Sequence, residues 1–207
     1  SSWGLNPTWG AQGDIPQTVE FRFKTDPAST NTPASQSLWS LDTGDNVLAV
    51  LEYDPSLLVS GSYSGSIPNP NYQSGSLVFT VDNFTTSATL SLPFFNGEWW
   101  SVSINRDEPD NYTIRAANSI YSGSNGSSLG WEASASLATG DESFYTGATN
   151  SYFPSDSRND IGSYTPLRGS YQEIRYYTVP LNSQSFFDYT MNPQSIEGNG
   201  INSGSSE

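Results

Sequence analysis

Hydrophobic residues recur at every second position in several short segments of this chain. In residues 19–24, Val19, Phe21 and Phe23 alternate with charged residues, which is the period-two pattern of a β-strand with one buried face. Similar segments predict further strands at 37–41, 46–53, 76–81, 88–92, 99–105, 112–116, 129–136, 142–146 and 171–179. Many short strands separated by turn residues are typical of an all-β sandwich or jelly roll.

A single segment near the C-terminus favours a helix. Residues 183–189 contain apolar side chains that can dock on the sandwich, and Asn182 or Ser183 can cap the first turn. Residues 199–207 are rich in Gly, Ser and Asn, a composition that is typical of a flexible linker. We therefore expect one domain over 1–198, with one short C-terminal helix, followed by a linker over 199–207.

Charge and composition narrow the possible partners. The 207 residues include 7 Lys and Arg and 21 Asp and Glu, which gives a net charge of −14. So few cations argue against nucleic acid and against an anionic membrane surface as partners. No apolar run approaches the ~20 residues of a membrane helix, so we expect no membrane insertion. The chain begins with Ser1 rather than Met, so we expect a domain or processed product of a larger protein.

Two residue types are absent from the chain, and each absence removes a class of chemistry. Without Cys there is neither a disulfide framework nor a zinc site built from thiolates. Without His there is no Ser-His-Asp triad and no imidazole metal ligand.

Three segments carry a recognisable pattern. The first is VEFRFKT at 19–25 followed by LWSL at 38–41, the second is NGEWWSVSINRD at 96–107, and the third is GSYQEIRYY at 169–177. In this order they resemble the concanavalin A-like lectin and glucanase superfamily, and within it the laminin-G-like modules. The second segment is similar to the family strand D-G-x-W-H-x-V-x-V-x-R-D, with Asn96 and Trp100 in place of Asp and His.

This resemblance implies a concanavalin A-like jelly-roll sandwich of two antiparallel sheets, in which the first and last strands are neighbours. The charged residues are consistent with this pairing of the first and last strands. Glu20 and Arg22 share one face of the first strand, and Glu173 and Arg175 share one face of the last, so opposite charges can face one another. Residues 187–199 resemble modules in structural proteins of phages and large DNA viruses. That narrower resemblance implies a location on a virion surface or outside the cell.

Because the superfamily also contains glycoside hydrolases, the placement of carboxylates is informative. A retaining hydrolase needs two carboxyl groups about 5–5.5 Å apart, which on one strand means acids at alternate positions. Glu52 and Asp54 have this spacing, but no further acid follows them, and the adjacent Asp141 and Glu142 point to opposite faces of a strand. We therefore expect that the chain is not an enzyme.

The candidate cofactor is calcium. Asp42, Asp45 and Asn46 lie in one predicted hairpin turn and supply the carboxylate and amide oxygens that calcium prefers. Asp and Asn are also ordinary turn-forming residues, so a turn without a metal explains them as well.

Aromatic rings are the candidates for ligand contact. Trp99 shares a face with Ser101 and Ser103, whereas Trp100 shares a face with hydrophobic residues and is expected in the core. Aromatic residues in loops also serve to pin the loops to the body of a domain. The candidate ligand-binding residues are Trp99, Tyr63, Tyr72, Tyr152 and Tyr164.

These features support three hypotheses. The first is a non-catalytic carbohydrate-binding or adhesion module of a larger viral or phage surface protein, with a glycan or a cell-surface receptor as partner. The second is a purely structural module that binds neighbouring protein subunits in an assembly, which a flat apolar surface patch would favour. The third and least favoured is a glycoside hydrolase.

Overall fold

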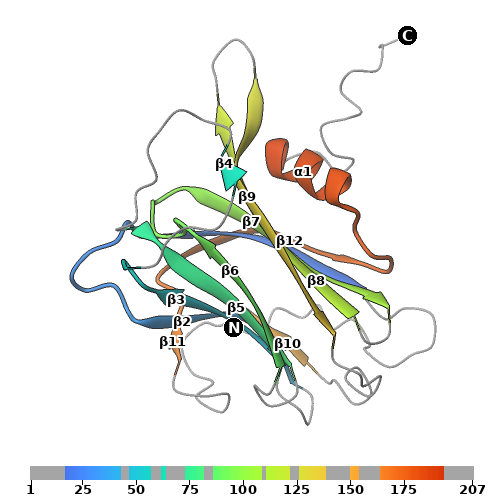
Figure 1. The fold of residues 1–207 in the computed structure, drawn as a ribbon, viewed down its shortest axis with the longest axis horizontal. Helices are drawn as coiled ribbons and strands as arrows, with labels where there is room; N and C mark the ends of the chain where they lie inside the picture. Colours follow the sequence, from blue (N-terminus) through green and yellow to red (C-terminus); the bar gives the residue numbers. More distant parts are fainter. Residues whose placement is uncertain are drawn as a thin grey trace.

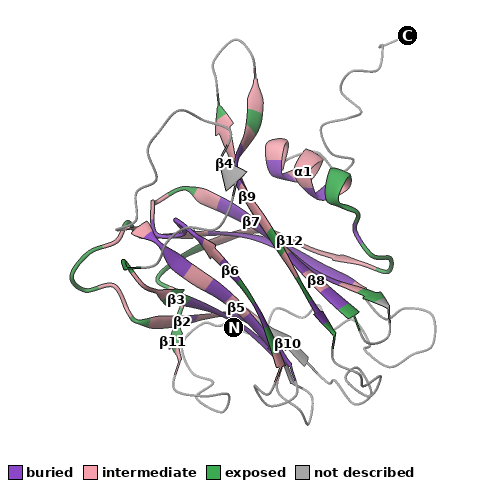
Figure 2. Cartoon of the chain, in the orientation of Figure 1, coloured by how far each residue is buried: buried purple, intermediate pink, exposed green. Residues whose placement is uncertain are grey.

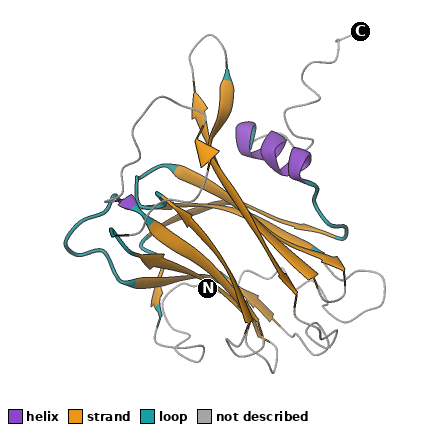
Figure 3. Cartoon of the chain, in the orientation of Figure 1, coloured by secondary structure: helices purple, strands orange, loops and turns teal. Residues whose placement is uncertain are grey.

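The computed structural model describes residues 17–42, 47–56, 62–63, 73–81, 86–108, 111–121, 126–138, 150–153 and 164–193. Within these residues, twelve strands and one helix form a β-sandwich of jelly-roll type (Figure 1; Figure 3). The elements are β1 (Thr18–Thr25), β2 (Ser35–Asp42), β3 (Val47–Tyr53), β4 (Ser62–Tyr63), β5 (Gly75–Val81), β6 (Thr86–Leu92), β7 (Trp99–Glu108), β8 (Asn111–Tyr121), β9 (Ser127–Ala138), β10 (Asn150–Tyr152), β11 (Thr165–Pro166), β12 (Gly169–Tyr177) and α1 (Ser183–Met191).

The strands form two sheets. The first has the order β12-β1-β7-β8-β9-β4, and because α1 packs against β7, β8 and β9 we call it the helix-bearing sheet. The opposite sheet has the order β10-β2-β3-β5-β6, with β11 beside β2. All strand pairs are antiparallel except that of β11 with β2. The first and last long strands, β1 and β12, are neighbours as expected, and Glu20 lies opposite Arg175.

The core lies between the two sheets and follows the alternation of the sequence. Phe21 and Phe23 on β1 are fully buried, as is Trp100, which lies opposite Phe23 on β7. Phe94 packs edge-on against Trp100 with ring centroids 4.8 Å apart. The prediction that Trp100 belongs to the core is therefore confirmed. Figure 2 shows buried positions along the strands of both sheets.

The helix buries a second, smaller apolar cluster on the outside of the helix-bearing sheet. Phe186 of α1 is fully buried there with Ala117 of β8 and Leu181 of the connection before the helix. Asn182 caps the helix, because its side-chain oxygen accepts a hydrogen bond of 2.8 Å from the backbone N–H of Ser185. The predicted helix and its cap are confirmed, and the helix extends two residues beyond the predicted end, to Met191.

Most predicted strands are present, with ends that differ by a few residues. The short strands β4, β10 and β11 were not predicted, because two or three residues show no periodicity. The strand predicted at 142–146 and the linker predicted at 199–207 lie outside the described residues. Within the part that the structure describes, no helix has the length and hydrophobicity needed to cross a membrane.

Candidate functional site

Trp99 is the one predicted ligand-binding residue whose surroundings are well defined. It begins β7 and is partly exposed, on the outer side of the helix-bearing sheet. Lys24 lies directly opposite it on β1, and the guanidinium carbon of Arg22 lies 5.5 Å from the centroid of the Trp99 ring. Trp99 therefore contributes to a basic surface and does not belong to a row of aromatic rings.

Among the other predicted aromatic residues, Tyr164 alone has a described side chain, and it lies on a different part of the sandwich from Trp99. Tyr164 is partly buried and precedes β11, which lies at the edge of the opposite sheet. Tyr63 pairs with Trp131 through the backbone of β4, and Tyr152 pairs with Ser40 through β10, but their side chains lie outside the described part. Tyr72 lies outside the described residues altogether.

The predicted calcium turn is mostly outside the described part of the structure. Asp42 ends β2, opposite Asn150 of β10, and its side chain is not described, while Asp45 and Asn46 fall in a gap. Among the described residues, no group of three Asp or Glu side chains is arranged to hold a metal ion. Calcium at Asp42, Asp45 and Asn46 stays a prediction.

The polar residues of β1 and β7 form a continuous surface beneath and beside α1. Glu20 lies opposite Ser103, which in turn lies opposite Arg115 of β8. Arg22 lies opposite Ser101 in the next row. These side chains alternate with the core residues of the same strands, so they must point to the outer side of the sheet. We call this surface the outer polar face.

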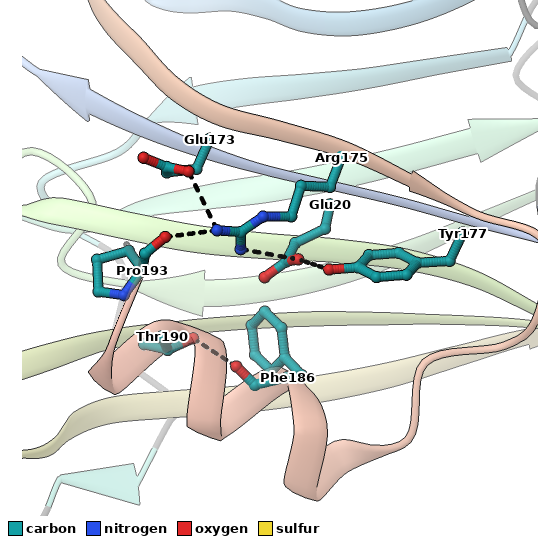
Figure 4. A network of polar contacts seen from close by, with 7 residues as sticks. All are labelled: Glu20, Glu173, Arg175, Tyr177, Phe186, Thr190 and Pro193. Carbon is teal, nitrogen blue, oxygen red and sulfur yellow. Dashed lines mark hydrogen bonds and ion pairs between the residues drawn. The ribbon is translucent and has the colours of Figure 1, made fainter. Parts of the chain in front are cut away.

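Glu20 is the centre of a buried network on this face (Figure 4). Its carboxylate accepts a hydrogen bond of 2.7 Å from the hydroxyl of Tyr177 and lies 3.5 Å from the guanidinium of Arg175. Burial raises the pKa of Glu20, and these two partners oppose that rise. The side chain of Glu20 is 2% exposed, so this carboxyl has little contact with solvent.

Arg175 joins Glu20 to a second carboxylate and to the end of the helix. Its guanidinium lies 3.1 Å from Glu173 and also donates to the backbone carbonyl of Pro193 (Figure 4). Glu173 has a positive φ of 54°, next to an irregularity in the pairing of β12 with β1. The irregularity places Glu173 and Glu20 on the same guanidinium. The sequence pattern predicts only that the charges of these two strands face one another.

A groove of about 460 Å³ opens beside the first turn of α1. It lies between the helix, the outer polar face and β6, the edge strand of the opposite sheet. Its lining combines one cation, one carboxylate, several hydroxyls and an aromatic ring: Thr89, Leu90, Arg115, Glu132, Ala133, Ser134, Ser183 and Phe187. Its volume falls within the range of ordinary ligand sites.

Arg115 is held at the floor of this groove. Its guanidinium donates a hydrogen bond of 3.3 Å to the backbone carbonyl of Leu181, and burial lowers the pKa of Arg115. The same carbonyl accepts a hydrogen bond of 2.7 Å from Asn105 on β7. Because Leu181 immediately precedes the helix cap, these contacts fix the first turn of α1 relative to Arg115.

Sequence reasoning did not identify the groove. Its residues come from four elements that are distant in the chain, and only Phe187 carries a local signal, as an apolar residue of the predicted helix. The alternation of β8 and β9 places Arg115 and Ser134 on one face, but alternation alone does not say which face a helix covers.

No family model matches the chain, and no curated protein matches it. Among solved structures, the chain is similar to the crystal structure of Scytalido-glutamic peptidase with a peptide-based transition state analog. The TM-score is 0.38 and the identity 9%, over 80% of this chain and 77% of that chain.

This match corrects one expectation from the sequence. We expected that the chain is not an enzyme, and the match to a peptidase structure contradicts that expectation. A search for acids at alternate positions of one strand cannot find Glu20 and Glu173, because these residues lie on two different strands. Their carboxylates come together at the guanidinium of Arg175. A likeness at this TM-score gives no reaction, substrate or catalytic residue for this chain.

Proposed function

We propose that this chain is a carbohydrate-binding module and that the groove beside the first turn of α1 holds the sugar. The observation that carries the proposal is the lining of that groove, in which Arg115, Glu132 and Ser134 lie beside the ring of Phe187. A sugar presents hydroxyl groups on its rim and C–H groups on its faces. It therefore needs both hydrogen-bonding side chains and a flat apolar surface.

The charged groups suit an uncharged, hydroxyl-rich ligand. The guanidinium of Arg115 can donate hydrogen bonds and the carboxylate of Glu132 can accept them, so neighbouring hydroxyls of one ring find complementary partners. Phe187 is partly buried on the helix, which leaves part of its ring available to a ligand. The polar groups of the groove lie on β8 and β9, which pair with each other in the sheet. Because the sheet fixes their backbone positions before a ligand arrives, less conformational entropy is lost on binding.

A role in binding neighbouring subunits has less support. Among the described residues, the large hydrophobic side chains that stand out to solvent are Tyr121, 76% exposed, and Val179, 61% exposed. Tyr121 ends β8, whereas Val179 lies in the connection from β12 to α1. Isolated residues of this kind are normal on a protein surface and do not indicate an interface. A viral origin and a location on a virion surface or outside the cell stay predictions from the sequence.

The test is binding of the whole chain to a glycan array, first with calcium and then with a chelator. We expect binding to a defined glycan class, and we expect Glu132→Gln and Phe187→Ala to weaken it about tenfold, the cost of one lost contact. Glu52→Gln is the matched control, because Glu52 is an exposed carboxylate on β3 of the opposite sheet.

Two results would overturn the proposal. One is a wild-type chain that binds no glycan on the array, which would make subunit assembly the leading hypothesis. The other is glycan binding that Glu132→Gln and Phe187→Ala leave unchanged. If such binding also disappears with the chelator, the site is the predicted calcium turn at Asp42 and not the groove.

A further inference from the structure

The outer edges of the two sheets differ in how they are protected. An unpaired edge presents backbone N–H and C=O groups to any approaching strand, and proteins commonly block such edges with short strands, bulges, charges or proline. The helix-bearing sheet has the edges β12 and β4, and the opposite sheet has β6 at one edge and β10 with β11 at the other. Within the described residues, β6 alone lacks a blocking feature.

The blocking feature is different at each of the other edges. The edge strand β12 carries two charged residues, Glu173 and Arg175, and its pairing with β1 is irregular beside Glu173. The two residues of β4 pair with Trp131 and Glu132 near the middle of β9, so a long strand cannot approach β9 there. β10 has three residues and β11 has two, one of which is Pro166. These features disfavour the addition of a further strand.

The edge strand β6 is regular and uncharged. Its seven residues, Thr86–Leu92, pair with β5 in one continuous register without a bulge, and they include no charged residue, proline or glycine. Ser87 and Thr89 are exposed on the outer side, whereas Ala88 and Leu90 are buried in the core. Because β6 ends its sheet, alternate residues direct their backbone N–H and C=O groups away from β5.

The sequence of β6 is complementary to itself. When two copies pair antiparallel about Thr89, this residue lies opposite the partner's Thr89, and Ser87 lies opposite the partner's Ser91. In the same register Ala88 lies opposite the partner's Leu90. Hydroxyls then meet hydroxyls on one side of the strand pair, and apolar side chains meet on the other, an arrangement that stabilises paired strands. A second copy of the chain therefore matches this edge on both of its sides.

We propose that two copies of this chain associate through β6, antiparallel about a two-fold axis at Thr89, so that their opposite sheets form one continuous sheet. The contact uses backbone groups and needs no exposed apolar patch. Both copies use the same edge, and the other edges are blocked, so the assembly ends at a dimer. Seven residues from each copy are few compared with the roughly 20–30 of a stable interface, so we expect a dissociation constant in the micromolar range.

The position of the groove gives this dimer a consequence for ligand binding. Thr89 and Leu90 of β6 line the groove. In the proposed register the Cα atoms of Thr89 and the partner's Thr89 lie about 4.5–5.5 Å apart, so the grooves of both copies lie beside the same axis. Two neighbouring sugar sites would bind a repeating glycan with avidity. This consequence rests on the proposed function, whereas the dimer itself does not.

The test is sedimentation velocity of the whole chain over a range of protein concentrations, in the absence of glycan. We expect a reversible equilibrium between monomer and dimer, with no larger species. Each copy carries a net charge of −14, so the copies repel one another over a distance set by the salt. The dimer should therefore become tighter from about 0.01 M to about 0.15 M ionic strength, as the Debye length falls from ~30 Å to ~8 Å. Because no glycan is present, failure of this test is distinguishable from failure of the proposed function.

Two variants locate the contact. Thr89→Lys places two ammonium groups opposite each other at the axis, and we expect it to weaken the dimer about tenfold or more, although it reduces the net negative charge. Ser170→Lys is the matched control, because Ser170 is an exposed hydroxyl residue on the edge strand β12 of the other sheet. It makes the same change of charge and should leave the dimer intact. Thr89 is exposed, so we expect both variants to fold, and urea unfolding checks this.

Four results would overturn the proposal. The first three are a chain that stays monomeric at every concentration and at both ionic strengths, equal weakening by Thr89→Lys and Ser170→Lys, and a dimer that Thr89→Lys leaves unchanged. The fourth is a monomeric chain whose β6 amides become protected from hydrogen exchange by a synthetic peptide with the sequence of residues 86–92. In that case the edge accepts a strand from another molecule but does not pair with itself.

Discussion

The guanidinium of Arg175 on β12 donates a hydrogen bond to the backbone carbonyl of Pro193, just beyond the end of α1. The same guanidinium lies over the ring of Tyr189 in the helix, 5.1 Å from its centroid, and pairs with Glu20 on β1. One side chain thus joins an edge strand, its neighbouring strand and the helix. The C-terminal end of α1 is held by Arg175, as its N-terminal end is held by the contacts of Leu181.

The first prediction concerns the loss of this connection. Arg175→Met keeps the aliphatic part of the side chain but leaves the carboxylate of Glu20 buried without its cation. We expect the free energy of unfolding at neutral pH to fall by about 3 kcal/mol, with faster amide exchange in α1 than in β7. Urea unfolding and hydrogen exchange measure these effects.

Arg168→Met is the control for the first prediction, because Arg168 is exposed and its guanidinium donates to a loop carbonyl. That variant is expected to change the free energy of unfolding by no more than about 0.5 kcal/mol. A similar loss from both variants would contradict the role assigned to Arg175.

The second prediction concerns pH. Burial raises the pKa of Glu20 above its ordinary value of 4.5, so the folded protein favours the neutral carboxyl. The stability that this preference contributes is complete below about 4.5 and is lost as the pH rises through the raised pKa of the folded state. Glu20→Gln is neutral at every pH and lacks this dependence.

The free energy of unfolding of Glu20→Gln minus that of the wild type should therefore increase as the pH rises above 4.5. The slope of this difference is at most about 1.4 kcal/mol per pH unit, the value for one proton. Urea unfolding of both proteins across the acidic range measures it. A difference that stays flat or decreases with pH would show that Tyr177 and Arg175 outweigh the cost of burial.

The strands and the core could be predicted because each depends on local alternation. Phe21 and Phe23 occupy alternate positions in β1, and Trp100 shares a face with Val102, so the inner side of the sandwich can be identified without knowledge of the partner strands. The helix cap was predictable for a similar reason, since Asn182 acts on a residue only three positions away.

The sequence predicts on which side of the sheet the residues of the outer polar face lie, but it does not predict that they are buried. Alternation predicts that Glu20, Arg22 and Ser101 point away from the core, and a polar residue in that position is ordinarily solvated. They are buried instead, on the face where Phe186 of α1 packs on Ala117 of β8. No local pattern specifies where a helix docks, so the groove could be identified only from the structure.

The third prediction concerns the helix cap. Asn182→Ala removes the side-chain oxygen that accepts the Ser185 N–H, and we expect a loss of about 1 kcal/mol in the free energy of unfolding. Asn182→Asp retains an acceptor oxygen at the same position and should lose much less. Urea unfolding compares the two variants, and an equal loss from both would show that the cap contributes little.

The fourth prediction uses two adjacent aromatic residues of α1 that have different environments. Phe186 is fully buried on the sheet, whereas Phe187 is partly exposed and lines the groove. Phe186→Ala should lower the free energy of unfolding by about 3–5 kcal/mol, because it leaves a cavity beneath the helix. Phe187→Ala should cost about 1 kcal/mol or less, since a partly exposed ring loses less burial.

The same pair should separate stability from binding. Phe187→Ala is expected to weaken glycan binding while the protein remains folded, and Phe186→Ala is expected to lower the stability of the helix more than that of the sandwich, whose core lies on the other side of the sheet. Urea unfolding, amide exchange in α1 and glycan binding, measured on both variants, test this separation. If Phe187→Ala costs as much stability as Phe186→Ala, then Phe187 serves to dock the helix, and the apolar surface that the groove offers to a sugar must be sought elsewhere in its lining.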